Sequence, residues 1–240
     1  MKQNETNRLK KSPLPNKKEK DMKQLFIVNQ HRPRLVLFFA GWGMDETPFL
    51  DYRPQESDLM ICYDYRRLDF DATLLTNYEE IHIVAWSMGV WAASQVLQHR
   101  ELRITRSIAI NGTPYPVDEE RGITPAIFNG TLQGLNAASL LKFQRRMCVN
   151  AEAFARFQSL APRRPWEELK EELAAIGQQC QALPPSSFVW NQAFIGDNDR
   201  IFPPQAQQKA WEGICPSIGH GSQAHYDDHQ LQSLITHNDE

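Results

Sequence analysis

Short apolar runs alternate along this chain with longer stretches in which apolar positions recur at helical spacing. Uninterrupted apolar runs of this length are typical of strands buried on both faces, as in a parallel sheet covered by helices. Helix-sized segments separate most of the runs, the clearest at residues 88–99. The pattern predicts an α/β protein with a mostly parallel central sheet and helices on both faces. Strands are expected at residues 25–29, 35–40, 59–63, 81–86, 106–111 and 188–195, with a weaker candidate at 214–219.

The alternation stops between residues 111 and 188, where no convincing strand pattern occurs. The segment opening Pro165-Trp166-Glu167-Glu168 has proline in its first turn and acids at the positive end of the helix dipole, as helix starts prefer. Helical patterns in this interval cover residues 136–148, 150–160 and 165–182. We therefore expect a helical cap at residues 115–185, inserted between the core segments 22–114 and 186–240.

Composition narrows the class of protein. No apolar run approaches the roughly 20 residues that a membrane-spanning helix needs. Residues 1–21 carry seven lysines and arginines against three acids and have no apolar stretch, so they predict a disordered extension rather than a secretory signal. They also lack the clustered arginines and interleaved aromatics of a nucleic-acid-binding arm. The four cysteines are scattered, which is typical of reduced thiols in a cytoplasmic protein.

Ser87 is the first candidate for chemistry. It stands in Ala85-Trp86-Ser87-Met88-Gly89, directly after the apolar run that ends at Val84 and directly before a helical pattern. A strand, a tight turn with serine at its tip and then a helix form the context of a nucleophile elbow. The small neighbours fit this interpretation, because strand and helix backbones approach closely there. The alternative is a serine that only caps the helix.

A glycine-rich turn, Gly41-Trp42-Gly43-Met44-Asp45, follows the expected strand at 35–40. Such a turn lets backbone N–H groups point at the target of the nucleophile. We expect the amides of Trp42 and Met88 to form an oxyanion hole, with the Trp42 side chain as an apolar wall of the pocket. The alternative is a plain turn that uses glycine for tightness.

An acid and a base are sought downstream of Ser87 in the order Ser, Asp, His. Asp199 lies in the loop after the strand expected at 188–195 and is the preferred acid, because an acid there can orient a histidine. Asp197 in the same loop and Asp118 are alternatives, and all three can be ordinary turn aspartates. His225 is the preferred base, since it leads into the last helical pattern. His220 is the alternative base.

The C-terminal region also contains the ligand types of a metal site, in His220, His225, His229, Asp227 and Asp228. Their spacing does not match the helical H-x-x-x-H pattern of zinc enzymes. We therefore expect neither a metal nor another cofactor.

These motifs resemble the α/β-hydrolase superfamily, and more closely the BioG-type pimeloyl-acyl carrier protein methyl ester esterases. The resemblance covers roughly residues 22–235. Its most specific segment is Phe38-Phe39-Ala40-Gly41-Trp42-Gly43-Met44-Asp45, whereas the elbow alone is generic. Other matching segments surround Ser87 and Asn111 or lie at 143–148, 201–204 and 224–226.

The resemblance implies hydrolysis of the methyl ester of pimeloyl-acyl carrier protein methyl ester in biotin synthesis, releasing methanol. Ser87 would be the nucleophile and His225 the base, with Gly41, Trp42, Met88 and Phe143 around the oxyanion hole and acyl group. Basic residues of the expected cap would then face an acidic acyl carrier protein, or else form ordinary solvated helix faces. These residues are Lys142, Arg145, Arg146 and Arg156.

Two other functions are compatible with the same residues. One is a general short-chain carboxylesterase or thioesterase, which would hydrolyse free esters as fast as carrier-bound ones. The other is a non-catalytic binding module that keeps the pocket but has lost the chemistry. Covalent labelling of Ser87 by a serine-directed fluorophosphonate separates the second from the enzymes.

Overall fold

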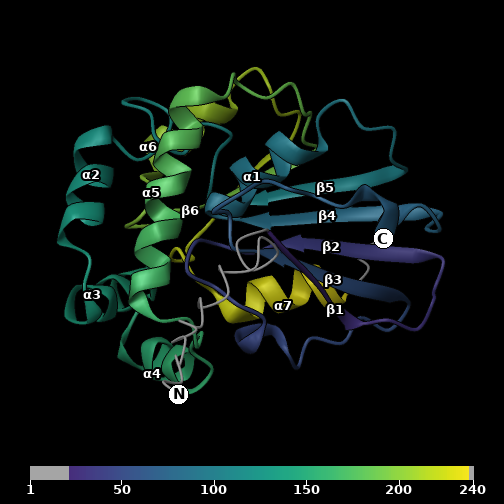
Figure 1. Ribbon diagram of the computed structural model, residues 1–240, viewed down its shortest axis with the longest axis horizontal. Coiled ribbons are helices and arrows are strands. Elements are labelled where there is room, and N and C mark those ends of the chain that lie inside the picture. The colour runs from purple at the N-terminus through teal and green to yellow at the C-terminus, as the bar shows by residue number, and fades with distance from the viewer. Residues whose placement is uncertain (1–21, 238–240) are drawn as a thin grey trace, which may run out of the picture.

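The core of the protein is one seven-stranded sheet, shown in Figure 1 in a computed structural model that describes residues 22–237. The strand order is β1-β3-β2-β4-β5-β6-β7, and only β1 runs antiparallel to its neighbour. A mostly parallel sheet is what the apolar runs predicted. The strands are β1 Lys23–Val28, β2 Arg34–Phe39, β3 Ser57–Tyr63, β4 Glu80–Trp86, β5 Ile104–Ile110, β6 Gln192–Gly196 and β7 Ile218–Gly221.

The last two strands begin later than expected. Immediately before β6, Asn191 is joined to the neighbouring strand through side chains rather than by backbone-to-backbone hydrogen bonds. Its backbone N–H donates to Ser107 Oγ, and its Oδ1 accepts from the Ser107 N–H. In front of β7, Pro216 has no N–H to donate to a neighbouring strand. The first residue of each of these two strands is therefore determined by a single neighbouring residue, which the pattern of apolar positions does not reveal.

Two helices were not predicted, α2 and α6. Each has a proline in its first turn, Pro125 and Pro204, where the missing N–H costs nothing, and Thr124 caps α2 through its side chain. Helices α1, α3, α4 and α5 begin and end within two residues of expectation. The helices are α1 Met88–Leu97, α2 Pro125–Gly134, α3 Ala137–Met147, α4 Ala151–Ser159, α5 Trp166–Ala182, α6 Pro204–Trp211 and α7 Asp228–Thr236, with short 3-10 turns at Thr47–Phe49 and Ala72–Leu75.

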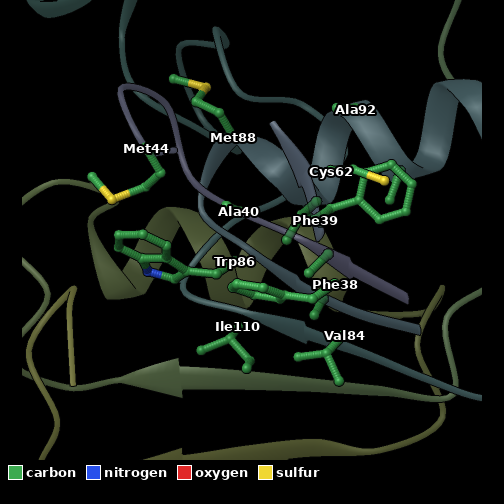
Figure 2. Packing of buried hydrophobic residues seen from close by; sticks show 14 of the residues in the cluster. Phe38, Phe39, Ala40, Met44, Cys62, Val84, Trp86, Met88, Ala92 and Ile110 are labelled. Carbon is green, nitrogen blue, oxygen red and sulfur yellow. The ribbon is translucent and has the colours of Figure 1, made fainter. Parts of the chain in front are cut away.

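Both faces of the sheet are covered. The run at the centre of β2 is fully buried, and its neighbouring residues point to opposite faces. Figure 2 shows Phe39 and Cys62 on the side of α1, near Ala92, with Phe38 and Val84 on the other side. Phe38 packs edge-on against Phe49, with ring centroids 5.0 Å apart. The continuous apolar runs are thus explained by burial on both sides.

Helices α2 to α5 follow one another between β5 and β6 and gather at the end of the sheet where the parallel strands finish (Figure 1). We call them the helical segment. Their chain position corresponds to the cap expected at 115–185, and the division into core and cap stays a prediction. The extension expected at residues 1–21 lies outside the described residues. Within residues 22–237, no helix is both long and apolar enough to cross a membrane.

A buried group of charges attaches α5 to the sheet. Arg164 Nη1 lies 2.7 Å from Oε2 of Glu172, and Arg164 Nη2 lies 3.3 Å from Oδ1 of Asp64, the residue after β3. Glu172 also accepts from the backbone N–H of Tyr65. Burial raises the pKa of Glu172, and the nearby Arg164 opposes that rise. Arg164 thus pairs with both buried carboxylates, and Arg66 is a second partner of Asp64.

Replacing Arg164 by methionine should therefore destabilise the fold by about 3 kcal/mol, because it leaves the buried carboxylate of Glu172 without a counter-charge. The loss should grow as pH rises, since protonation of Glu172 relieves the buried charge at low pH. Urea unfolding at pH 5 and pH 8 measures both effects. Arg163→Met is the matched control, because the Arg163 side chain is exposed. Equal stabilities for the two variants would show that the buried network contributes nothing.

Candidate active site

Ser87 lies at the turn between β4 and α1 in a conformation that few residues other than glycine adopt, with φ of 61°. Two glycines make this turn possible. A Cβ on Gly89 would come within 2.3 Å of the carbonyl oxygen of Phe39, and one on Gly112 within 2.3 Å of the carbonyl oxygen of Ser87. The close approach expected around the serine is therefore present in the structure.

Three predicted side chains form a buried row. Ser87 Oγ lies 2.9 Å from Nε2 of His225, and Nδ1 of His225 lies 2.9 Å from Oδ2 of Asp199. An ionised carboxylate only accepts hydrogen bonds, so this arrangement places the proton of the neutral ring on Nδ1 and leaves Nε2 to accept from Ser87. Phe202 stacks on the histidine ring with an interplanar angle of 10°.

The carboxylate of Asp199 is held from several sides. Its Oδ1 accepts from the backbone N–H groups of Ile201 and Phe202, at 2.7 and 2.9 Å. Its Oδ2 accepts from Nε2 of the fully buried Gln207 at 3.1 Å, as well as from His225. The carboxylate is therefore fixed in the orientation that faces the histidine.

The alternative acids and base lie elsewhere. His220 and Asp197 pair with each other at 3.1 Å on the exposed surface, and His220 also contacts Gln208. Asp118 forms an ion pair with Arg121 at 2.8 Å. The structure brings Asp199 and His225 to Ser87 and leaves the other three residues away from it.

Asn111 is a site residue that the sequence did not single out. It follows β5 with a φ of 47° and is buried. Its Nδ2 donates to the carbonyls of Ala224 and His225, and its Oδ1 accepts from the N–H of Gly196. It therefore ties the loops that carry His225 and Asp199 to the strand beside Ser87.

The Gly41-Trp42-Gly43-Met44-Asp45 turn is attached to the helical segment. Trp42 Nε1 donates to the carbonyl of Leu169 in α5 at 2.9 Å. Asp45 Oδ2 accepts from the backbone N–H of Arg163, and Arg164 donates to the carbonyl of Met44. The turn is thus held at three points by residues at or just before α5.

The two backbone N–H groups expected to form the oxyanion hole are free to bind a substrate oxygen. Among the described residues, neither the Trp42 nor the Met88 N–H donates to a protein acceptor. Gly41 packs directly beneath this region, since a Cβ there would meet the Trp86 ring at 2.9 Å. Both the loop amide and the first amide of α1 can therefore bind an anion.

Ser87 and His225 open into a mainly apolar pocket. Phe143 of α3 packs edge-on against Trp42, with centroids 5.2 Å apart, and Arg146 contributes a cation. Most of the remaining lining is aliphatic or aromatic and comes from Trp86, Met88, Ile123, Ile127, Phe128, Thr131, Met147, Leu173 and Ile201. Such a lining suits an acyl chain.

The basic residues expected to meet a carrier protein lie on two helices of the helical segment. Lys142, Arg145 and Arg146 are exposed on α3, and none of them forms an ion pair with a described residue. Arg156 on α4 contacts His229 at 2.7 Å and lies 3.9 Å from Glu152. Within residues 22–237 no group of three or more His, Cys, Asp and Glu side chains could hold a metal ion.

A mostly parallel sheet, a strained serine between strand and helix, and Asp and His on later loops define the α/β-hydrolase fold. Distant solved structures share it: an esterase from Thermogutta terrifontis superimposes with a TM-score of 0.58 at 13% identity, covering 89% of this chain and 88% of that one. The chain belongs to the family described as pimeloyl-ACP methyl esterase BioG, whose model matches residues 22–239. The crystal structure of BioG from Haemophilus influenzae has a TM-score of 0.80 at 36% identity and covers 90% of this chain and 100% of that one.

A curated relative corrects the predicted reaction. A protein of Bacteroides fragilis named malonyl-[acyl-carrier protein] O-methyltransferase is 61% identical over 204 residues, or 85% of this chain. Its name describes the addition of a methyl group, so the prediction that this chain removes the methyl ester of pimeloyl-acyl carrier protein methyl ester is contradicted. The chain spans 42% of the length of that relative.

Proposed function

We propose that the protein is a serine carboxylic-ester hydrolase whose substrate is an acyl chain presented by an acyl carrier protein. The observation that carries this proposal is the buried row of Ser87, His225 and Asp199 at an apolar pocket. Family membership and the carrier named for the Bacteroides relative support the carrier as partner.

The geometry supports a two-step acyl transfer. His225 removes the proton of Ser87, the serine oxygen attacks the ester carbonyl, and the alcohol leaves with the proton from His225. The Trp42 and Met88 amides bind the oxygen that becomes negative in the transition state. Water then attacks the acyl-enzyme with His225 again as base, which releases the acid and frees Ser87.

Two measurements on the full chain test this proposal. A fluorophosphonate probe should label Ser87, identified by peptide mass spectrometry, and p-nitrophenyl butyrate should be hydrolysed. Acyl carrier protein esters, with an oxygen ester at the far end of acyl chains of several lengths, should be hydrolysed with higher kcat/KM. Absence of labelling and of turnover would overturn the enzyme assignment. Equal kcat/KM for free and carrier-bound esters would overturn the proposal that an acyl carrier protein presents the substrate.

The exposed basic residues of α3 and α4 should contribute to hydrolysis of the carrier-bound ester but not to hydrolysis of a free ester. Reversing the charge of Arg145 and Arg156 together should lower kcat/KM for the carrier-bound ester by about tenfold at low salt, because complementary charge mainly speeds encounter. The difference should shrink at high salt. Arg103→Glu is the control, an exposed cation just before β5. An equal loss with p-nitrophenyl butyrate would instead indicate damage to the pocket.

A further inference from the structure

Helix α6 joins the loop of Asp199 to the turn of Ser87. Its Gln207 and Trp211 are fully buried and lie one helical turn apart, so they share one face of the helix. Gln207 Nε2 donates to Asp199, and Trp211 Nε1 donates to the carbonyl of Gly112 at 3.1 Å. Gly112 packs directly against the backbone of Ser87. One face of α6 therefore holds both the acid of the site and the chain behind the nucleophile.

Two acceptors determine the orientation of the Gln207 amide. Its Nε2 lies 3.1 Å from Oδ2 of Asp199 and 2.8 Å from the carbonyl oxygen of Phe202. The reverse orientation would place the amide oxygen against both of these oxygens, none of which can donate. The orientation that donates leaves Oε1 of Gln207 buried and without a hydrogen-bond partner among the described residues.

This unpartnered oxygen makes glutamine an unfavourable residue for packing alone. Burial of such a group costs free energy, and an apolar side chain of the same length avoids that cost. The compensating feature is the donor that Nε2 gives to Oδ2 of Asp199, the oxygen that also accepts from His225. Gln207 does not line the pocket of Ser87. Any effect of this amide on catalysis therefore passes through the carboxylate.

We propose that Gln207 is a positioning residue that holds Oδ2 of Asp199 at the point where this oxygen accepts from His225. The two backbone N–H groups that bind the carboxylate reach only Oδ1. Gln207 binds the other oxygen, on which the orientation of the histidine ring depends. The ring is then kept where its Nε2 accepts from Ser87. The inference rests on the proposed function, because it assigns a role within that reaction.

Kinetics of Gln207→Met test this role, since methionine keeps the chain length and the helix propensity but removes the amide. We expect kcat for p-nitrophenyl butyrate to fall about tenfold while KM stays within about twofold, because the acid is displaced and the pocket is unchanged. Gln207→Leu should give the same split between kcat and KM. Gln205→Met is the matched control, because it makes the same change at an exposed position of α6 and should keep wild-type kcat.

A double-mutant cycle shows whether the effect passes through Asp199. In the Asp199→Asn background, Gln207→Met should change the single-turnover rate, measured with enzyme in excess, by less than about twofold, because residues that act as a unit are not additive. A tenfold loss in both backgrounds would overturn the positioning role. So would a lower urea-unfolding midpoint with kcat unchanged, which indicates packing alone. A wild type that neither reacts with a fluorophosphonate nor hydrolyses the ester would instead overturn the proposed function.

Discussion

Replacing Ser87 by alanine is expected to lower ester hydrolysis by about five orders of magnitude, because loss of the nucleophile removes the covalent route and leaves only the oxyanion hole and binding. The fold should persist, since the serine hydroxyl contacts only His225 among the described side chains. The measurement is kcat for p-nitrophenyl butyrate and for a carrier-bound ester, with the circular dichroism spectrum of each variant.

The control for this variant is Ser233→Ala, which removes a hydroxyl from an exposed position in α7. It should keep full activity. If Ser87→Ala retained more than a tenth of wild-type turnover, the serine would be a structural turn residue and another nucleophile would have to be found.

Replacing Asp199 by asparagine should lower kcat by about 10⁴-fold, the size of effect seen when a triad acid loses its charge. An asparagine NH₂ facing His225 cannot accept from Nδ1–H and favours the tautomer with the proton on Nε2. That proton would point at Ser87 and prevent it from giving up its own. The Asp199 carboxylate also accepts two backbone N–H bonds, so the stability of the variant is measured alongside its activity.

Asp197→Asn gives the matched comparison. It makes the same chemical change two residues away, where the carboxylate faces His220 on the surface. We expect its kcat to stay within about twofold of wild type, because a weak exposed pair contributes little. A larger loss in Asp197→Asn than in Asp199→Asn would exchange the assignments of the two acids.

The centre of the sheet was predictable because its strands are buried on both faces and are therefore largely apolar, as the residues of β2 show. Helices and strands whose boundaries depend on single residues were harder to predict from the sequence. In the sequence, the main sign of helices α2 and α6 is a proline in the first turn, Pro125 or Pro204. The main sign of the start of β7 is Pro216. A proline marks a boundary but not which element lies beside it.

The local sequence context identified Ser87 and His225 as candidates and favoured Asp199 as the acid, but it left Asp197 as a close alternative. The two acids share one loop and one chemistry. What separates them is burial: Asp199 turns inward onto the N–H groups of Ile201 and Phe202, while Asp197 faces solvent. The contacts of Asn111 reach residues 85 to 114 positions away, and no local pattern reports partners at that distance.

The attachment of the glycine-rich turn to α5 has a consequence for how this protein can diverge. Two of its three links join a side chain of the turn, Trp42 or Asp45, to main-chain atoms of the helical segment. Any residue supplies a carbonyl at position 169, and any residue except proline supplies an N–H at position 163. Surface residues of the helical segment can therefore be substituted during evolution to suit new partners, while Trp42 and Asp45 stay unchanged and keep these links.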